Sequence, residues 1–451
     1  MRVSDRSSSV DPTLRGRPSS ALSGVLGLLR ERARRIRGLF AALEGNARVI
    51  VITEGLAAIA FGWVGTYLPL YMLALGVTKM QIGVLSSVLI ATKLLSTLAG
   101  GYLADRMGRK RVLVIFDIFC WGVPMFLYAV AQNPVYFFVG RLINGLVYVV
   151  MPSFECLFVE DVPVERRPAV FGALQFLQAG ARLFVPVSGL LVAWLGLVPA
   201  GRLIAAVTAV SSISIAVLRH FTMHETTMGR ERMSAVAGAP VWALLREYAD
   251  ALRNAVRDRR LRTVLIVRNL TMFVTTMWMT YSVIYLTDAQ GVGLAESSVA
   301  ILPFVSALAT IAAILLAAER WQSGRVYGNL LLGQGLWLAA AGVYVLSPTG
   351  TIGWFLVWAV VSALSTALYR PAEQSYWANV VGDRERAQVF AASSALTALV
   401  TLPAGPLAGA LYEILPRGPF LLAIGLQLVA LGLIVSLRTS KGSKSSARSD
   451  E

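Results

Sequence analysis

Twelve apolar segments, each long enough to cross a lipid bilayer as a helix, divide this 451-residue chain. A bilayer core about 30 Å thick needs roughly 20 helical residues, and only helices or closed barrels satisfy every backbone polar group inside it. The segments are too long and too uniformly apolar for the alternating strands of a barrel, which have about ten residues each. They fall at residues 48–75, 81–104, 111–131, 134–158, 169–195, 199–218, 263–288, 295–318, 327–346, 352–377, 386–412 and 417–437. The sequence therefore predicts an all-α, polytopic membrane protein.

The composition excludes a soluble enzyme. Hydrophobic residues make up 56% of the chain and charged residues 15%, whereas soluble domains carry about 45–50% and about 25%. A soluble globule of this size would lack the charges to cover its surface, and so apolar a chain is not disordered either. Cys120 and Cys156 lie within apolar segments, where we expect no disulfide framework.

Cations gather in alternate connections between the segments. Because Lys and Arg concentrate in the short cytoplasmic loops of membrane proteins, this pattern places both termini in the cytoplasm and the chain in the inner or plasma membrane. The net charge of +16 then reflects contact with an anionic inner leaflet rather than with nucleic acid, for which no motif is present. The cations concerned are Arg106, Arg109, Lys110, Arg111, Arg166, Arg167, Arg320, Arg325, Arg384 and Arg386.

Five regions follow from the pattern of apolar and basic residues. A basic cytoplasmic tail, 1–47, carries apolar residues at helical spacing from Val25 to Leu43, which suits either an interfacial helix or a tail that only fixes orientation. An N-terminal bundle spans 48–218 and a C-terminal bundle spans 263–437. The linker 219–262 contains a second basic amphipathic segment, and 438–451 is expected to be a disordered cytoplasmic tail.

The two bundles carry a weak internal repeat. Pro152 precedes Pro371 by 219 residues, and Val170-Phe171 precedes Val389-Phe390 by the same 219. Pro186 and Gly189 recur 220 residues later as Pro406 and Gly409. These shared offsets favour two pseudo-symmetric six-helix bundles, the architecture on which secondary transporters build a site near the middle of the membrane.

The connection after the second segment reads Gly101-Tyr102-Leu103-Ala104-Asp105-Arg106-Met107-Gly108-Arg109-Lys110-Arg111. Gly101 and Gly108 permit a sharp turn and close approach, and Asp105 can accept hydrogen bonds from amides at a neighbouring helix N-terminus. An ordinary positive-inside loop would explain the cations but not the glycines and the aspartate. This spacing favours a structural gate.

With this motif the sequence resembles the major facilitator superfamily, whose signature between helices two and three is G-x-L-A-D-R-x-G-R-K-x. The resemblance covers residues 48–437 and implies two six-helix bundles that rock about a central cavity. It also implies an inner gate that locks the outward-open state, with acidic partners at the end of helix four. The gate residues carried over are Gly101, Asp105, Arg106, Gly108, Arg109, Lys110, Glu160 and Asp161.

Two further family patterns are matched only in part. Arg141-Leu142-Ile143-Asn144-Gly145 is similar to R-x-x-Q-G with Asn in place of Gln, which makes a coupling role for Arg141 a hypothesis. The antiporter pattern G-x-x-x-G-P-x-x-G is reduced in helix five to Gly180, Pro186 and Gly189, and this weakens the case for export by antiport.

Ionisable residues inside the spans are the candidate proton or substrate site, because burying each costs about 2.5–3.5 kcal/mol on insertion scales. Either the cavity binds an anionic group, or the glutamates carry protons while the cations adjust their pKa values. A purely structural role, such as an ion pair between Arg370 and Glu373, is the alternative. Asp117 is expected to be solvated near the inner surface. The candidates are Glu54, Lys93, Arg141, Glu155, Arg182, Arg370 and Glu373.

Aromatic residues on helices one, seven and ten could stack on an amphipathic ligand, although such residues also serve packing or the interfacial belt. They are Trp63, Tyr67, Tyr71, Trp278, Tyr281, Tyr285, Trp358 and Tyr369. The sequence contains no metal-binding, nucleophile or ATP-binding motif, so we expect no metal, no cofactor and no enzyme activity.

The sequence thus predicts a secondary active transporter that moves a small molecule by alternating access. The favoured activity is proton-coupled export of a small amphipathic or organic compound by a monomer. Uptake of an organic anion or sugar is the alternative, which the cations in the middle of the membrane favour. A receptor that keeps the fold without transport is a further alternative.

Overall fold

The computed structural model describes residues 43–235, 257–321, 326–380 and 386–446, together with 38, 40, 41 and 253. Helices fill almost all of these ranges and no strand occurs within them. The predicted all-α class is therefore confirmed.

We call Gly45–Thr222 the first half of the molecule. Its elements are α2 (Gly45–Ala74), α3 (Lys79–Met107), α4 (Arg109–Asp117), η2 (Ile118–Gly122), α5 (Val123–Ala129), α6 (Pro134–Asn144), η3 (Gly145–Val149), α7 (Met151–Val159), η4 (Val164–Arg166), α8 (Arg167–Ala181), η5 (Arg182–Phe184), α9 (Val185–Leu195) and α10 (Leu197–Thr222). The short helix α11 (Thr227–Ala235) follows.

The second half begins at Arg259. Its elements are α13 (Arg259–Thr287), η6 (Glu296–Ala300), α14 (Ile301–Trp321), α15 (Val326–Leu346), α16 (Ile352–Val380), α17 (Arg386–Thr401), α18 (Ala404–Ile414) and α19 (Gly418–Ser446).

Nine helical segments among the described residues are long and apolar enough to cross a membrane, and a tenth is formed by α6, η3 and α7 together, with a bend of 40°. The two helices α3 and α13, of 29 residues each, occupy the positions of the two remaining predicted spans. The helical segments thus follow the predicted order along the chain.

Prolines mark the breaks within several of these spans. Pro152 is the second residue of α7, which follows the turn η3, and Pro186 is the second residue of α9, which follows the turn η5. Pro124 likewise follows the π-helical turn η2. Proline has no N–H to donate and its ring clashes with the preceding turn, so a helix kinks or breaks at this residue. In the span made of α6, η3 and α7 the two pieces meet at a bend of 40°.

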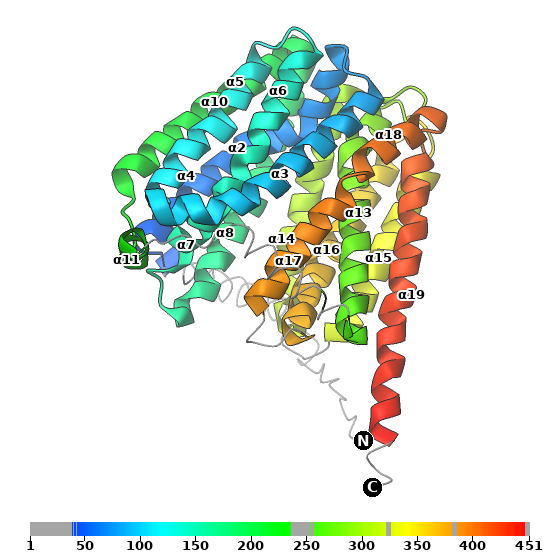
Figure 1. Cartoon of the computed structure of the whole chain (residues 1–451). Helices are drawn as coiled ribbons and strands as arrows, with labels where there is room; N and C mark the ends of the chain where they lie inside the picture. The colour runs from blue at the N-terminus through cyan, green and yellow to red at the C-terminus, as the bar shows by residue number, and fades with distance from the viewer. Residues whose placement is uncertain are drawn as a thin grey trace, which may run out of the picture.

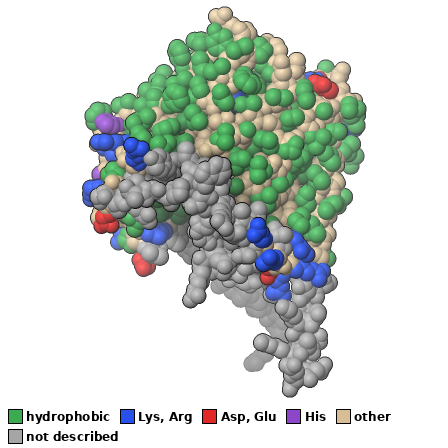
Figure 2. All heavy atoms as spheres, in the orientation of Figure 1, with side chains coloured by type: hydrophobic (Ala, Val, Ile, Leu, Met, Phe, Trp, Pro, Cys, Tyr) green, Lys and Arg blue, Asp and Glu red, His purple; other side chains and the backbone are tan. Residues whose placement is uncertain are grey.

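The two halves converge at one end and diverge toward the other (Figure 1). We call the diverging end, where α11 lies, the linker side, and the converging end the far side. Figure 2 shows that the visible helical surface is largely apolar, with Lys and Arg gathered toward the linker side. This distribution suits a protein whose middle faces lipid and whose basic end faces an anionic surface.

Several helices extend past the predicted segment boundaries. α10 continues to Thr222 and α11 forms inside the predicted linker. The last helix, α19, continues to Ser446, so part of the expected disordered tail is helical. Extending a helix past its apolar stretch needs no new nucleus, which explains why the helix does not end at the lipid boundary. The amphipathic segments expected at 25–43 and 244–256 lie outside the described residues, apart from 38, 40, 41, 43 and 253.

Candidate functional site

The gate motif turns sharply at Gly108, between α3 and α4. Gly108 has a φ of 88°, a conformation that favours glycine. A Cβ atom added there would lie 2.8 Å from both Glu225 Oε2 and Met233 Sδ. The glycine thus serves both roles considered from the sequence, a turn and a close approach.

The cations after this turn are held by the linker-side end of the first half. Arg109 forms an ion pair with Glu160 and donates to the Thr226 hydroxyl over 3.1 Å. Thr226 in turn donates to Glu160 Oε2 over 2.7 Å. The backbone N–H of Lys110 donates to Glu225 Oε2 over 3.0 Å. These contacts join the motif to α7 and to the start of the linker, all on one side of the gap between the halves.

The other gate residues have different surroundings. Asp161 lies 3.4 Å from Nε2 of His224, and Arg106 is exposed. Gly101 and Asp105 belong to α3, but the side chain of Asp105 and the surroundings of Gly101 lie outside the described set. The gate role of Asp105 therefore stays a prediction.

A second buried polar cluster joins three helices of the first half. Arg219, only 3% exposed, donates to Asp117 Oδ2 over 2.7 Å and to Glu54 Oε1 over 2.6 Å. Its Nη2 also donates to the Thr53 hydroxyl over 2.9 Å. The expectation that Asp117 is solvated was wrong, because the guanidinium of Arg219 on α10 supplies the compensating charge inside the bundle.

Sequence reasoning missed Arg219 because it was assigned to the linker. Depth in the membrane could have identified Arg219, because Glu54, Asp117 and Arg219 each lie near the linker-side end of an apolar span. Two acidic residues at that depth require a cation on a neighbouring helix.

On the far side, a polar latch connects the halves. Lys79 Nζ lies 2.5 Å from Asp288 Oδ2, and the Tyr412 hydroxyl donates to the same oxygen over 2.9 Å. The Tyr281 hydroxyl donates to the Lys79 carbonyl over 2.8 Å. Burial raises the pKa of Asp288, but the hydrogen bonds from Lys79 and Tyr412 outweigh it and hold that pKa below its ordinary value. The latch is therefore an ionic contact at neutral pH.

Close backbone contacts extend the far-side seam beyond the latch. Gly83 on α3 faces Gly405 on α18 so closely that a Cβ on either would overlap the carbonyl of the other. Ser87 on α3 donates to the Leu402 carbonyl just before α18. These contacts hold α3 against α18.

Two glycines of the internal repeat, Gly189 and Gly409, lie at close contacts between the halves on the far side. A Cβ on Gly189 of α9 would lie 2.6 Å from the Ser297 carbonyl oxygen in η6, and one on Gly409 of α18 would lie 3.1 Å from the Cα of Met80 in α3. The Tyr67 hydroxyl donates to the Glu296 carbonyl over 3.1 Å beside the first of these contacts. The repeat therefore forms two seams between the halves, α9 with η6 and α18 with α3.

A cavity of about 540 Å³ lies between the first half and α13. Arg141 and Asn144 contribute to its wall from α6, and Thr276 and Thr280 from α13. The guanidinium of Arg141 has no ion pair or hydrogen bond with any described residue, and its Nε is buried. Apolar parts of the wall include Phe61, Trp121, Met125 and Met279.

Two further arginines lie in the spans without an ion pair to described residues. Arg182, in the break η5 of the first half, and Arg370, on α16 of the second half, are both exposed. The charge of Arg370 acts on Arg182 across the two halves. Lys93 is different, because its Nζ lies 4.1 Å from the ring centroid of Tyr148, a cation–π contact.

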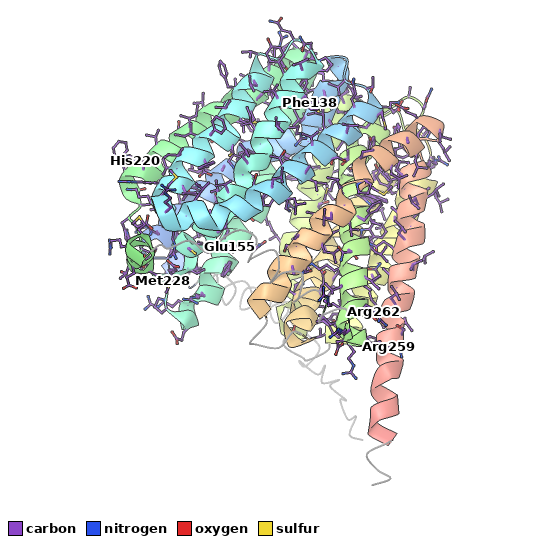
Figure 3. All side chains as sticks on the ribbon, viewed as in Figure 1. Phe138, Glu155, His220, Met228, Arg259 and Arg262 are labelled. Atoms are coloured by element: carbon purple, nitrogen blue, oxygen red, sulfur yellow. The ribbon has the colours of Figure 1, made fainter. Side chains whose placement is uncertain are left out.

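The acidic candidates other than Glu54 lie in contrasting surroundings. Glu155 on α7 is exposed, and Figure 3 shows it at the edge of the first half nearest the second half. Glu373 on α16 lines a small pocket with Arg268 and Tyr369, and its Oε1 is buried without a hydrogen-bond partner. The charges of both Arg268 and Arg370 act on Glu373, but no ion pair joins Arg370 to Glu373 among the described residues.

The aromatic residues selected from the sequence do not line the cavity between the halves. Tyr67, Tyr71, Tyr281 and Tyr285 are at most 1% exposed. Trp278 and Trp358 pack against Tyr344 in the second half, Trp63 donates to the Phe184 carbonyl, and Tyr369 lines the Glu373 pocket. Phe61 and Trp121 line the cavity instead. Apolar spacing alone does not show which face of a helix in a bundle meets a cavity and which meets its neighbours.

No group of three or more His, Cys, Asp or Glu side chains that could hold a metal ion occurs among the described residues.

Residues 50–328 match the family model described as Major Facilitator Superfamily. Quinolone resistance protein NorA of Staphylococcus aureus (strain MRSA252) is 23% identical over 394 residues, which cover 84% of this chain and 92% of the relative. Multidrug resistance protein MdtG of Escherichia fergusonii is 30% identical over 159 residues, or 34% of this chain and 39% of that protein.

Solved structures share the fold. The crystal structure of the nucleoside transporter NupG superimposes with a TM-score of 0.65 at 15% identity, covering 87% of this chain and 99% of that one. A POT family transporter in complex with 5-aminolevulinic acid gives a TM-score of 0.64 at 14% identity, with 87% of this chain and 95% of that chain covered.

Proposed function

Since the chain belongs to the major facilitator superfamily and is a transporter rather than an enzyme, we propose that it exports small amphipathic organic compounds in exchange for protons. NorA and MdtG, whose names denote quinolone and multidrug resistance, support export as the direction. The positive-inside pattern supports a cytoplasmic linker side, with both termini there, in the plasma or inner membrane. We propose that the protein works as a monomer, because the cavity lies within a single chain.

The arrangement of the halves supports alternating access. The described hydrogen bonds that cross between the halves lie toward the far side, around Lys79, Ser87 and Tyr67. With the linker side in the cytoplasm, this is the state that receives a solute from inside. Rocking the halves about the cavity would then break the latch and expose the solute to the far side.

The observation that carries proton coupling is the setting of Glu373. Its carboxylate has a buried oxygen without a hydrogen-bond partner, beside the guanidinium of Arg268 and the hydroxyl of Tyr369. A carboxylate that can gain or lose a proton as its surroundings change is what coupling to a proton gradient requires. Glu54 is less suited, because Arg219 holds it as an ion pair, and Glu155 is exposed.

The test is solute-induced proton movement in proteoliposomes that contain an internal pH dye. Ethidium, an amphipathic cation, and 2-naphthoate, an amphipathic anion, are the first solutes. We expect the native chain to move protons with at least one of them and Glu373→Gln to lose this movement while it still exchanges labelled solute. Glu165→Gln, which neutralises an exposed acidic residue of η4, is the control and should keep it. Proton movement that persists in Glu373→Gln would remove Glu373 as the carrier.

Uptake of an organic anion remains the second candidate function. The arginines without ion pairs, Arg141, Arg182 and Arg370, favour an anionic solute whichever way it moves. The direction of the proton movement in the same assay distinguishes exchange from co-transport.

A further inference from the structure

Several carboxylates of the spans have a cationic partner, whereas several of the arginines have no acidic partner. Glu54 and Asp117 share Arg219, and Glu160 binds Arg109. Arg141, Arg182 and Arg370 have no ion pair with any described residue. The described residues thus leave these three guanidinium groups without an ion pair.

Arg141 is the one of these three that lines the cavity. Its Nε is buried and has no hydrogen-bond acceptor among the described side chains and backbone groups. An arginine presents five N–H donors in a planar fork that matches a carboxylate. A buried charged donor without a partner is costly, so a ligand that supplies the acceptor gains that free energy on binding.

The other walls of the cavity suit the rest of such a ligand. Phe61, Trp121 and Met125 offer an apolar surface, and Thr276 and Thr280 offer hydroxyls from the second half. However, each of these threonines already donates its hydroxyl proton to a carbonyl one turn earlier on α13, Thr276 to Met272 and Thr280 to Thr276. The cavity therefore has one free charged donor on one side and mostly apolar wall opposite.

Arg182 and Arg370 extend the positive charge toward the linker side. They come from opposite halves, and their charges repel. Any motion that brings the halves together on the linker side increases this repulsion unless an anion lies between the two guanidinium groups. An anionic solute would be attracted into the path and would also permit the path to close behind it.

We infer that the cavity binds an amphipathic organic anion, whose acidic group pairs with Arg141 and whose apolar body lies against Phe61, Trp121 and Met125. This inference rests on the proposed transport function and names the substrate class of the same site. A neutral or cationic solute of equal size fills the same volume but leaves the Arg141 charge unpaired.

Binding of three naphthalene probes to the purified full-length chain in lipid nanodiscs tests the inference. The probes are 2-naphthoate, 2-naphthamide and 2-naphthylmethylammonium, which share one ring system and differ in charge. Isothermal titration calorimetry gives the affinities without a proton gradient. We expect the carboxylate to bind about tenfold or more tightly than the amide, as a charge-assisted hydrogen bond predicts, and the ammonium to bind most weakly.

Variants assign the preference to the arginine. Arg141→Gln should bind the carboxylate and the amide equally, and Arg141→Lys should keep a reduced preference, because an ammonium lacks the planar fork. Arg202→Gln is the matched control, since Arg202 donates to the Ala131 carbonyl outside the cavity. Thermal unfolding of each variant shows that the fold is kept.

Three outcomes would overturn the inference. They are an ammonium that binds as tightly as the carboxylate, a carboxylate preference that survives in Arg141→Gln, and no binding of any probe up to about 10 mM, an affinity too weak to matter. Proton movement with a cationic solute would leave the proposed transport function standing while the anion inference failed. Carboxylate binding without proton movement would leave the anion inference standing while the proposed proton-coupled transport failed.

Discussion

The polar contacts on the two sides of the molecule differ in what they connect. On the linker side, Arg109 with Glu160 and Arg219 with Glu54 join helices of the first half to one another. On the far side, Lys79 and Asp288 join the first half to the second. Charge on the linker side therefore stabilises one half as a rigid body, whereas charge on the far side stabilises one arrangement of the two halves.

This comparison changes the meaning of the gate motif. The Arg109–Glu160 pair is present while the halves meet on the far side, so it is not a contact that forms only when the linker side closes. We interpret it as a brace that holds the α3–α4 turn in shape. The gate role that the family resemblance implies for Asp105 stays a prediction.

The largest expected effect is on the brace of the first half. Arg219→Gln leaves Glu54 and Asp117 buried without a cation, which should cost about 3–5 kcal/mol and lower the yield of folded protein. Thermal unfolding in detergent and the yield after size-exclusion chromatography measure this loss. The triple variant Glu54→Gln, Asp117→Asn, Arg219→Met removes all three charges and should recover most of the stability. Native stability in Arg219→Gln would show that the cluster is not a brace.

The next effect concerns the seam between the halves. Gly83→Ala puts a Cβ against the Gly405 carbonyl, so the far side should separate and the two-state population should shift by tenfold or more, about 1.4 kcal/mol. Distances between spin labels at Gln132→Cys and Thr349→Cys, in a chain without Cys120 and Cys156, measure the separation. Gly342→Ala is the control, since a Cβ there meets nothing within 4 Å. A distance distribution unchanged from the native chain would contradict the seam.

The smallest effect is on the latch. Asp288→Asn removes one charge from a pair in which Lys79 is 31% exposed and Asp288 is 13% exposed. Because solvent screens so exposed a pair, we expect a shift toward far-side opening of about 1 kcal/mol, or roughly fivefold. The same spin-label distances measure it. An equal shift in a Lys79→Met background would show that the two side chains are not coupled.

The latch also has a defined pH dependence. Since the pKa of Asp288 lies below its ordinary value in the closed form, closure is fully favoured above the ordinary pKa and is lost as the pH falls through the lowered one. Far-side distances should therefore stay constant from about pH 8 to about pH 5 and lengthen only in stronger acid. Opening already near neutral pH would assign the response to another group.

Local patterns predicted the parts of the structure that local physics determines. Apolar length located the helical spans, and the gate motif located the turn at Gly108. Arg109 and Glu160 could be paired only through the family resemblance, because their contact joins different spans.

The contacts that depend on which face of each helix meets its neighbours could not be predicted. Tyr281 was selected as a ligand contact but is buried in the far-side seam, whereas Trp121, which lines the cavity, was not selected. Asp117 was placed in solvent because its partner, Arg219, is about a hundred residues away in sequence and was assigned to the linker. Long-range pairing of this kind leaves no periodic signal in a single chain.

The doubled glycine seam has a consequence for how such a transporter can evolve. Because Gly189 and Gly409 close the far side at two separate places, a substitution at one of them would wedge open a single edge while the other still acts as a hinge. The molecule would then tilt instead of parting evenly, and its mouth would admit solutes from one flank only. Substitutions at the two glycines can therefore change the width and the direction of the exit independently.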